Sequence, residues 1–230
     1  WWAKDLPIYR GRFNFDTIVI KFYKDPTAML EAFKRGDFDI YDVRIAKVWA
    51  KEMVGPKFEG LRYIKKELLP NHNTQGGQGF VFNLRQPLFQ DVRVRQAIAL
   101  AFDFDWSNRN LFFEQYAQNE SFFQGTPLAA TGMPSPEELA VLTPLKADLP
   151  EEVFTKPMGW LGKGQSIQDR LRLAMQLLKA AGYQTKDGVA EGPGGRLQFK
   201  FLTEPGGLQR VIEPYLQNLR KLGIVVSIEE

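Results

Sequence analysis

GFVFNLRQPLFQDVRVRQAIALAFDFDW, residues 79–106, is the stretch of sequence that decides the fold. Its apolar residues 80–82 predict a short strand, which Pro87 must end because proline has no amide hydrogen to donate to a sheet. Asp91 then stands where a helix N-cap accepts a hydrogen bond from a backbone amide. Behind it, apolar residues recur at the spacing that buries one face of a helix: Val92, Val94, Ala97, Ile98 and Ala101.

Further segments continue the alternation of strands and helices. Residues 16–23 predict a strand, and residues 27–40 predict a helix that Gly36 stops, followed by a second strand. Residues 170–183 predict a helix with one apolar stripe. Residues 197–228 predict a strand, a helix and a more buried strand, which is a βαβ unit. The chain is therefore predicted to be an α/β protein.

Residues 113–165 separate the two groups of elements and are rich in glycine, proline and threonine. Within them, Ser135 and Glu138 have the spacing of a capping box, which predicts a short helix. A connection of this length is uncommon in a compact domain, so it is either an extra surface layer or a functional loop. Because the apolar faces on both sides of it match, we expect residues 1–230 to form a single α/β domain.

Composition limits the function classes. The chain is 44% apolar and 25% charged, which suits a globular domain with a real core. It has no cysteine, so disulfides, thiolate metal sites and cysteine nucleophiles are excluded. Its net charge of +3 comes from basic residues that are mixed with acids, so nucleic acid is not indicated. No apolar run approaches the roughly 18 residues that a membrane span needs, and no membrane insertion is expected.

The inventory of reactive side chains argues against catalysis. His72 is the only histidine, and the sequence has neither a nucleophile elbow nor a phosphate-binding loop. Two close pairs of carboxylates lie at element boundaries, where capping and turn formation are their expected roles: Asp37 with Asp39, and Asp103 with Asp105. One histidine and scattered acids do not assemble a metal site. No catalytic residue, cofactor or metal site is therefore predicted.

The order of residues 83–103, from Asn83 through Pro87, Asp91 and the run RVRQAIALAFD, resembles the motif of the peptide- and nickel-binding class of solute-binding proteins, which serve ABC importers. The segments 27–40, 170–183 and 195–228 fit that family in the same order. Two more segments, KDLPIYRGRFNFD near the start and LAATGMPSPEELA in the middle, are similar to the branch linked with uptake of murein peptides and microcin C.

The resemblance implies one lobe of a type II periplasmic-binding-protein fold, with a mixed central sheet flanked by helices. It also implies a fragment whose remaining lobe belongs to the same polypeptide. The implied activity is periplasmic: a peptide-like ligand is captured between two lobes and delivered to an inner-membrane ABC permease. Two alternatives stay open on sequence alone. One is a stand-alone α/β hydrolase that uses acidic residues, and the other is a sensor or scaffold lobe that has lost transport.

The expected ligand-binding residues come from element ends. Ligands of open α/β sheets bind outside the carboxyl ends of strands, and the resemblance places the strand end near residue 40 and the strand start near residue 79 at the cleft. Glycines there would allow close approach of a ligand backbone, and the turn before the last helix would offer free amides. The residues are Tyr41, Asp42, Arg44, Gly76, Gly77, Gly79, Thr203, Glu204, Gly206 and Gly207. A flexible loop and an ordinary turn are the plainer interpretations of the two glycine-containing segments.

Overall fold

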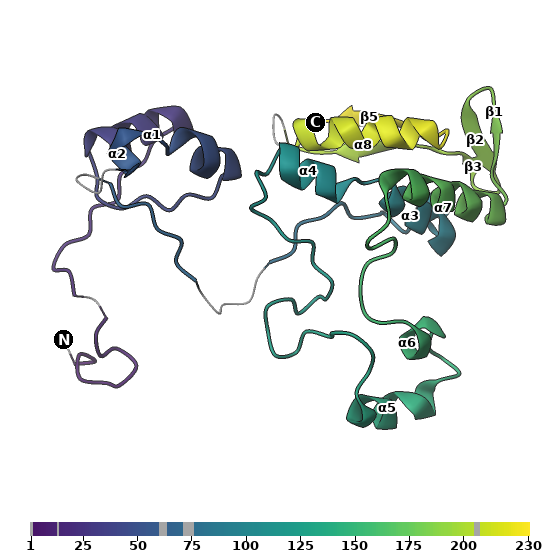
Figure 1. The fold of residues 1–230 in the computed structure, drawn as a ribbon, viewed down its shortest axis with the longest axis horizontal. Coiled ribbons are helices and arrows are strands. Elements are labelled where there is room, and N and C mark those ends of the chain that lie inside the picture. The colour runs from purple at the N-terminus through teal and green to yellow at the C-terminus, as the bar shows by residue number, and fades with distance from the viewer. Residues whose placement is uncertain (1, 13, 60–63, 71–75, 205–207) are drawn as a thin grey trace. The chain divides into compact units, whose positions relative to one another are not determined.

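The computed structural model describes residues 2–12, 14–59, 64–70, 76–204 and 208–230 (Figure 1). The chain divides into two compact units, Trp1–Glu67 and Leu68–Glu230. Each unit is described by itself below. The expectation that residues 1–230 act as one domain stays a prediction.

The first unit is built around helix α1, Pro26–Arg35. Asp25 caps it by accepting a hydrogen bond from the amide of Ala28 at 2.9 Å, and Gly36 ends it in the left-handed conformation with φ 87°. A π-helical turn, η1 (Val48–Glu52), and a short helix, α2 (Pro56–Glu59), follow. Together these elements bury a small apolar cluster: Leu30, Val48, Met53 and Phe58.

The two strands expected in this unit are absent from the described residues. Residues 16–23 and 37–40 carry no regular secondary structure. Ile18, Val19 and Ile20 are each more than 70% exposed, and Phe22 is 92% exposed. The run of apolar, β-branched residues that predicts a strand is present, but a strand also needs a neighbouring strand to pair with. No described segment supplies that neighbour.

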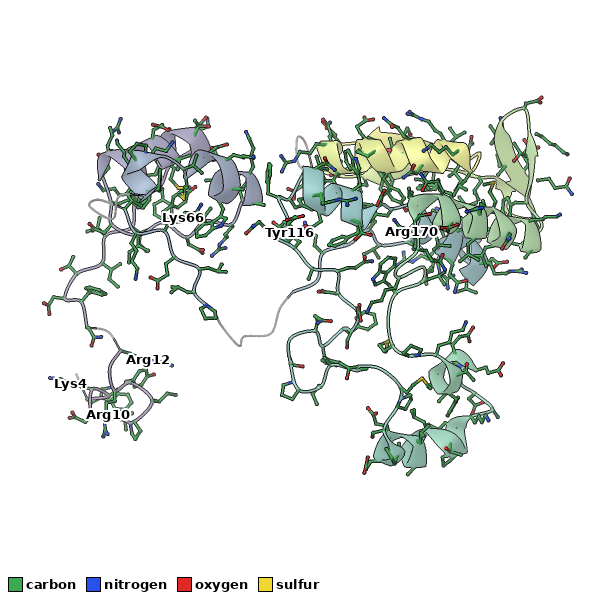
Figure 2. All side chains as sticks on the ribbon, in the orientation of Figure 1. Lys4, Arg10, Arg12, Lys66, Tyr116 and Arg170 are labelled. Carbon is green, nitrogen blue, oxygen red and sulfur yellow. The ribbon has the colours of Figure 1, made fainter. Side chains whose placement is uncertain are left out.

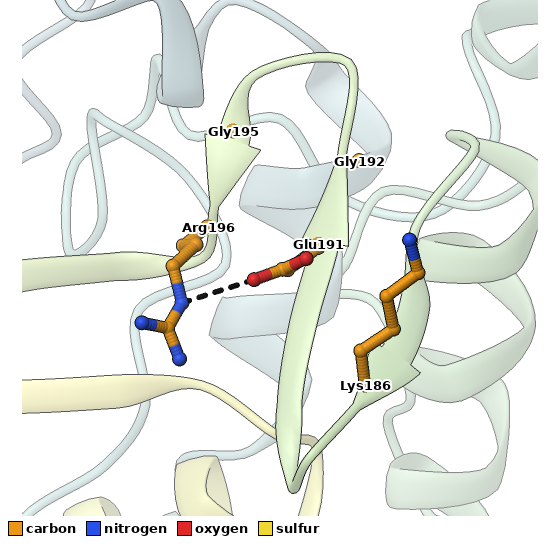
Figure 3. Close-up of a pocket in the computed structure, with 5 residues that line it drawn as sticks. All are labelled: Lys186, Glu191, Gly192, Gly195 and Arg196. Atoms are coloured by element: carbon orange, nitrogen blue, oxygen red, sulfur yellow. Dashed lines mark ion pairs between the residues drawn. The ribbon is translucent and has the colours of Figure 1, made fainter.

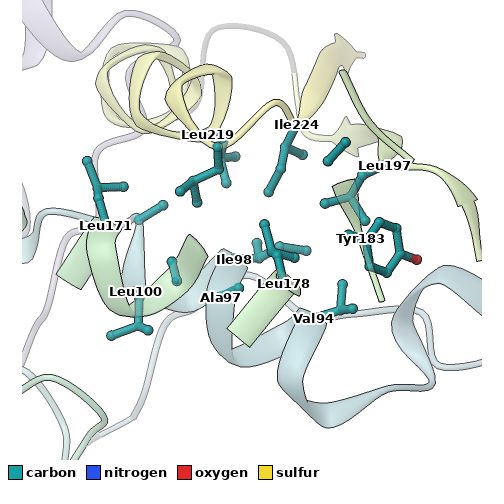
Figure 4. Close-up of a cluster of buried hydrophobic side chains, with 14 of the residues drawn as sticks. Val94, Ala97, Ile98, Leu100, Leu171, Leu178, Tyr183, Leu197, Leu219 and Ile224 are labelled. Carbon is teal, nitrogen blue, oxygen red and sulfur yellow. The ribbon is translucent and has the colours of Figure 1, made fainter. Parts of the chain in front are cut away.

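The second unit holds the main core, which lies between three helices (Figure 4). These are α3 (Val92–Leu100), α7 (Ile167–Ala180) and α8 (Gln209–Lys221). Asp91 caps α3 as expected, with its carboxylate 2.8 Å from the amide of Arg93. A 3₁₀ turn, η2 (Pro87–Phe89), leads into α3, and α4 (Phe104–Asn110) follows it.

The buried face of α3 is close to the predicted one. Val94, Ala97 and Ala101 are fully buried, and Ile98 is 1% exposed. Val92 is the exception, because it is 50% exposed. It is the first residue of the helix, where the chain has not yet entered the core. Leu100, which is 2% exposed, joins the core instead.

Two buried side chains of α8 form hydrogen bonds with backbone carbonyls at the carboxyl-terminal end of α3. The hydroxyl of Tyr215 donates to the backbone carbonyl of Ile98 at 2.7 Å. The side-chain amide of Asn218 donates to the backbone carbonyl of Ala101 at 3.0 Å. These carbonyls lie at the carboxyl-terminal end of α3, where intrahelical donors run out, and the carbonyl of Ile98 also accepts from the backbone amide of Ala101 at 3.2 Å. Burial raises the pKa of Tyr215 well above its ordinary value, so the hydroxyl remains a donor.

The predicted βαβ unit is confirmed, but its second strand is not the more buried one, because buried and exposed positions alternate in the same way in both strands. Strand β4 (Gln198–Leu202) pairs in parallel with β5 (Val225–Glu229), with Phe199 opposite Val226, and α8 connects them. Pro214 lies inside α8 without ending the helix. The sheet expected in the centre of the lobe is thus a parallel pair in the described residues.

A second small sheet was not predicted. Strands β1 (Gln184–Lys186), β2 (Val189–Gly192) and β3 (Gly195–Arg196) form an antiparallel meander. Its first turn is Asp187-Gly188, whose φ angles of 48° and 78° suit a tight hairpin. Asp-Gly between short polar strands is the sequence signal that would have revealed it.

The strand expected at residues 80–82 is not formed, because no backbone ladder joins these residues to the described strands. The side chains nevertheless pack as predicted. Phe80 and Phe82 lie against the main core, and the ring of Phe80 is 4.9 Å from that of Phe201. Tertiary packing without ladder hydrogen bonds therefore holds this segment.

The middle segment, residues 113–165, forms its own short elements outside the core: α5 (Pro136–Leu142), η3 (Thr143–Leu145) and α6 (Glu152–Thr155). The predicted capping box is confirmed, with Ser135 and Glu138 bonding reciprocally. None of these three elements contains a buried residue. These three elements therefore form a surface layer, whereas Gly162 near the end of the segment is buried.

Arg170 attaches the end of this segment to the core (Figure 2). The residue is 2% exposed, and its guanidinium donates to the carbonyl of Phe102 at 2.9 Å and pairs with Asp103 at 3.1 Å. It also lies 5.5 Å from the ring centre of Trp160. A buried cation needs such partners to offset its desolvation.

Truncating Ile98 to alanine should lower the free energy of unfolding by about 2–5 kcal/mol, since it leaves a cavity between the helices. The matched control is Val92→Ala in the same helix, which should change stability by less than about 0.5 kcal/mol. Urea denaturation of both variants measures the difference. Equal effects would mean that α3 does not pack with this face inward.

Candidate ligand-binding site

Gly76, Gly77 and Gly79 form an exposed strip that leads to Phe80. None of the three has a left-handed backbone, and a methyl group on Gly76 or Gly79 would meet no described atom within 4 Å. Neither backbone conformation nor packing therefore requires glycine at these two positions. What glycine does provide is a bare main chain that another main chain can approach closely.

Ring contacts join the segment that follows the glycine strip to β4. Phe80 contacts Phe201, with ring centres 4.9 Å apart. Phe82 contacts Phe89 at 5.2 Å, and Phe89 in turn contacts Phe199 at 5.2 Å. The glycines therefore lead to a residue, Phe80, that packs beside Phe201 near the carboxyl end of β4.

Thr203 and Glu204 directly follow the carboxyl end of β4, the end at which Phe201 contacts Phe80. The amide of Thr203 donates to the carbonyl of Glu229 at 3.0 Å, which fixes the strand end, while Glu204 is exposed. Helix α8 begins nearby at Gln209 without a side-chain cap, so its first amides have no side-chain acceptor among the described residues. Gly206 and Gly207 lie outside the described residues.

The first unit contains three of the predicted site residues, Tyr41, Asp42 and Arg44, and they differ in exposure and contacts. The Tyr41 ring packs against Phe33 at 5.5 Å, and burial, with the nearby carboxylate of Glu52, raises the pKa of its hydroxyl. Asp42 and Arg44 are exposed and pair with each other at 2.9 Å. Tyr41 is thus chiefly a packing residue, while the ion pair is open to solvent.

Two surface hollows lie apart from these residues. One, of about 350 Å³, is lined by Lys186, Glu191, Gly192, Gly195 and Arg196 of the small antiparallel sheet, with Glu191 and Arg196 paired at 3.1 Å (Figure 3). The other, of about 380 Å³, lies beside α4. Its lining residues are Asp105, Asn108, Arg109 and Glu114.

Asn119 is the residue near the glycine strip that the sequence analysis missed. A methyl group built on Gly77 would lie 3.0 Å from the side-chain nitrogen of Asn119, so this amide covers the glycine. The two residues are far apart in sequence, and no local pattern marks the asparagine. Its position beside Gly77 can be recognised only in the three-dimensional structure.

The described residues offer no cluster of side chains for metal binding. None of their histidine, aspartate and glutamate side chains form a group that could hold a metal ion. His72 lies outside the described residues. Asp103 has a structural role, because it caps α4 and forms an ion pair with Arg170. No helix in the described part of the chain is long and apolar enough to cross a membrane.

The family is decided by a match over the whole sequence. Residues 1–230 match the family model of the bacterial extracellular solute-binding proteins, family 5 middle domain. The chain belongs to this family.

Two curated relatives match the whole chain. It is 39% identical over 235 residues to the uncharacterized protein YejA of Escherichia coli, covering 100% of this chain and 39% of that protein. It is 37% identical over 236 residues to the probable peptide-binding protein YejA of Agrobacterium fabrum, covering 99% of this chain and 38% of that protein. The chain therefore spans well under half the length of these relatives.

Among solved structures, the chain is similar to NikA of Brucella suis in complex with Fe(III)-EDTA, with a TM-score of 0.57 and 19% identity. The likeness covers 96% of this chain and 39% of that one. At this identity the likeness shows the fold alone. The predicted class, an α/β lobe of the type II periplasmic-binding-protein fold, is confirmed.

Replacing Gly76 by alanine should leave the free energy of unfolding within about 0.5 kcal/mol of the original. The contrasting variant is Gly162→Ala, because Gly162 has φ +82° and its methyl group would lie 2.8 Å from Leu100. That change should cost about 1–3 kcal/mol. Thermal unfolding of the two variants tests whether the glycine strip is free of a folding role; a large loss from Gly76→Ala would show that it is not.

Proposed function

We propose that this chain is one lobe of a two-lobed periplasmic protein that captures peptide-like ligands and delivers them to an inner-membrane ABC permease. Membership of the solute-binding family supports this proposal, as does similarity to a relative named as a probable peptide-binding protein. The remaining lobe belongs to the same polypeptide in this proposal. The ligand is held between the two lobes and is not chemically changed.

The observation that carries the proposal is the bare glycine strip at the carboxyl end of β4. The fold does not need glycine at Gly76 or Gly79, and no described residue pairs with the strip through backbone hydrogen bonds. An extended peptide has a free amide and a free carbonyl at each residue, which are the groups such a strip can pair with. Side chains at these positions would hold the peptide away.

Exposed charged groups in each unit would recognise the ends or side chains of a peptide. In the first unit, the Asp42–Arg44 pair keeps both charges at the surface, and Arg44 is 85% exposed in its side chain. In the second unit, Glu204 is an exposed carboxylate beyond β4. Enclosure of such groups strengthens their hydrogen bonds because water no longer competes for them.

A binding function without catalysis is consistent with the structural roles of the acidic residues. Asp103 accepts a hydrogen bond from the amide of Trp106 and pairs with buried Arg170. Asp37 pairs with Arg35 at 2.7 Å. These carboxylates serve helix ends and turns, and the hydrolase interpretation gains no support from them.

Arg44→Ala and Glu204→Ala should each weaken peptide affinity about tenfold or more while stability stays nearly unchanged. A hydrogen bond to a charged group is worth roughly 1.5–3 kcal/mol. The test protein is a two-lobed chimera in which this chain replaces the matching residues of the E. coli relative, and calorimetric titration gives the affinity. Lys186→Ala, in the hollow of the antiparallel sheet, is the control. Unchanged affinity in both variants would remove the two residues from the site.

The 230-residue chain alone should hydrolyse no peptide and bind peptides more weakly than micromolar. One wall of a cleft leaves most of a ligand solvated, so much of the binding free energy is lost. Titrating peptides of several lengths against the chain and against the chimera measures the difference. Micromolar or tighter binding by the chain would place the whole site within it, and turnover would refute a binding-only function.

A further inference from the structure

Asn119 stands out because its side-chain amide has no hydrogen-bond partner among the described residues, although it lies over Gly77. Its residue is exposed, so the amide is open to a ligand. Asparagine offers two N–H donors and one carbonyl acceptor, which is the complement of a peptide group. The same short stretch of surface therefore presents a bare main chain and a free side-chain amide.

The backbone around Asn119 is held on both sides. The side chain of Asn108 receives a hydrogen bond from the amide of Tyr116 at 3.2 Å and donates one to its carbonyl at 2.8 Å. Beyond Asn119, the amide of Glu120 donates to the side chain of Gln124 at 3.2 Å, and its carboxylate pairs with Lys163. A residue fixed in this way loses little further freedom when it binds a ligand.

The contact also joins the middle segment to the glycine strip. Asn119 comes from the start of the segment that spans residues 113–165, and Gly77 comes from the strip that precedes Phe80. Both belong to the second unit, so their contact lies within one compact body. Gly77 is the strip's point of contact, since Gly76 and Gly79 have no described atom near the position of a methyl group.

We propose that Asn119 is a ligand-binding residue whose side-chain amide hydrogen-bonds the main chain of a peptide lying along Gly76, Gly77 and Gly79. This assignment rests on the proposed function, and it names the recognised group as the peptide bond. The middle segment thereby supplies part of the binding surface. Gly77 leaves room for the asparagine amide, because a methyl group there would push against it.

The test is nuclear magnetic resonance on the ¹⁵N-labelled chain of 230 residues, which reports weak binding residue by residue. Trialanine is added at millimolar concentration, and an ω-amino acid of equal chain length serves as the matched ligand with the same charged ends and no peptide bond. Trialanine should shift the side-chain resonances of Asn119 together with the backbone amides of Gly77 and Gly79, with one dissociation constant. The ω-amino acid should shift none of them.

The variants separate this role from a structural one. Asn119→Ala should weaken trialanine binding, followed at Gly79, about three- to tenfold, which is the value of a neutral hydrogen bond. Gly77→Ala should weaken it as well, because its backbone tolerates alanine but the methyl group displaces the asparagine amide. Asn110→Ala, an exposed asparagine that bonds only within α4, should leave affinity unchanged.

Three results would overturn the assignment. If the glycine amides shift while Asn119 does not and Asn119→Ala binds normally, Asn119 is not a ligand residue, although the proposed function stands. If the ω-amino acid gives the same shifts, the charged ends are recognised and the peptide bond is not. If trialanine shifts neither the glycines nor Thr203, the proposed site itself is in the wrong place.

Discussion

The packing of α3 against α7 is the constraint on which the second unit depends. Ala97 and Ala174 are fully buried where the helices face each other, and small residues there let the helix axes approach closely. Arg93 reaches from one helix to the carbonyl of Ala180 in the other at 2.7 Å. Helix α8 then closes the pair by bonding the terminal carbonyls of α3. Helix α3 therefore makes polar contacts with both of the other helices.

That helical core positions the candidate site indirectly. Phe80, Phe201 and Tyr215 form one aromatic cluster, with Phe80 and Tyr215 stacked at 5.8 Å. The cluster holds the segment after Gly79 beside β4 although no ladder joins them. The glycines can therefore keep their backbone groups free for a ligand while their position stays fixed. A paired strand at the same place would have used some of those groups already.

Much of this could be predicted from sequence, where local chemistry decides the outcome. Asp25, Asp91 and Ser135 cap the helices expected of them, and the βαβ unit follows the predicted boundaries closely. The strands at residues 16–23 and 80–82 failed because pairing is a property of two segments and the pattern of one cannot guarantee it. The Asp187-Gly188 hairpin was overlooked despite its turn signal, and Asn119 carried no signal at all. Whether the sequence-based site residues bind ligand stays a prediction.

The exposed run from Ile18 to Phe22 has a consequence for the behaviour of the chain in concentrated solution. Isoleucine, valine and phenylalanine in an unpaired segment combine high β-propensity with apolar surface, the composition that nucleates cross-β stacking between copies. Only Lys21 interrupts it, and its ammonium group is engaged with the carbonyl of Asp37. The tendency of the chain to aggregate is therefore expected to depend on a few residues that do not belong to its main core, and a polar residue at position 19 is the simplest gatekeeper against fibril formation.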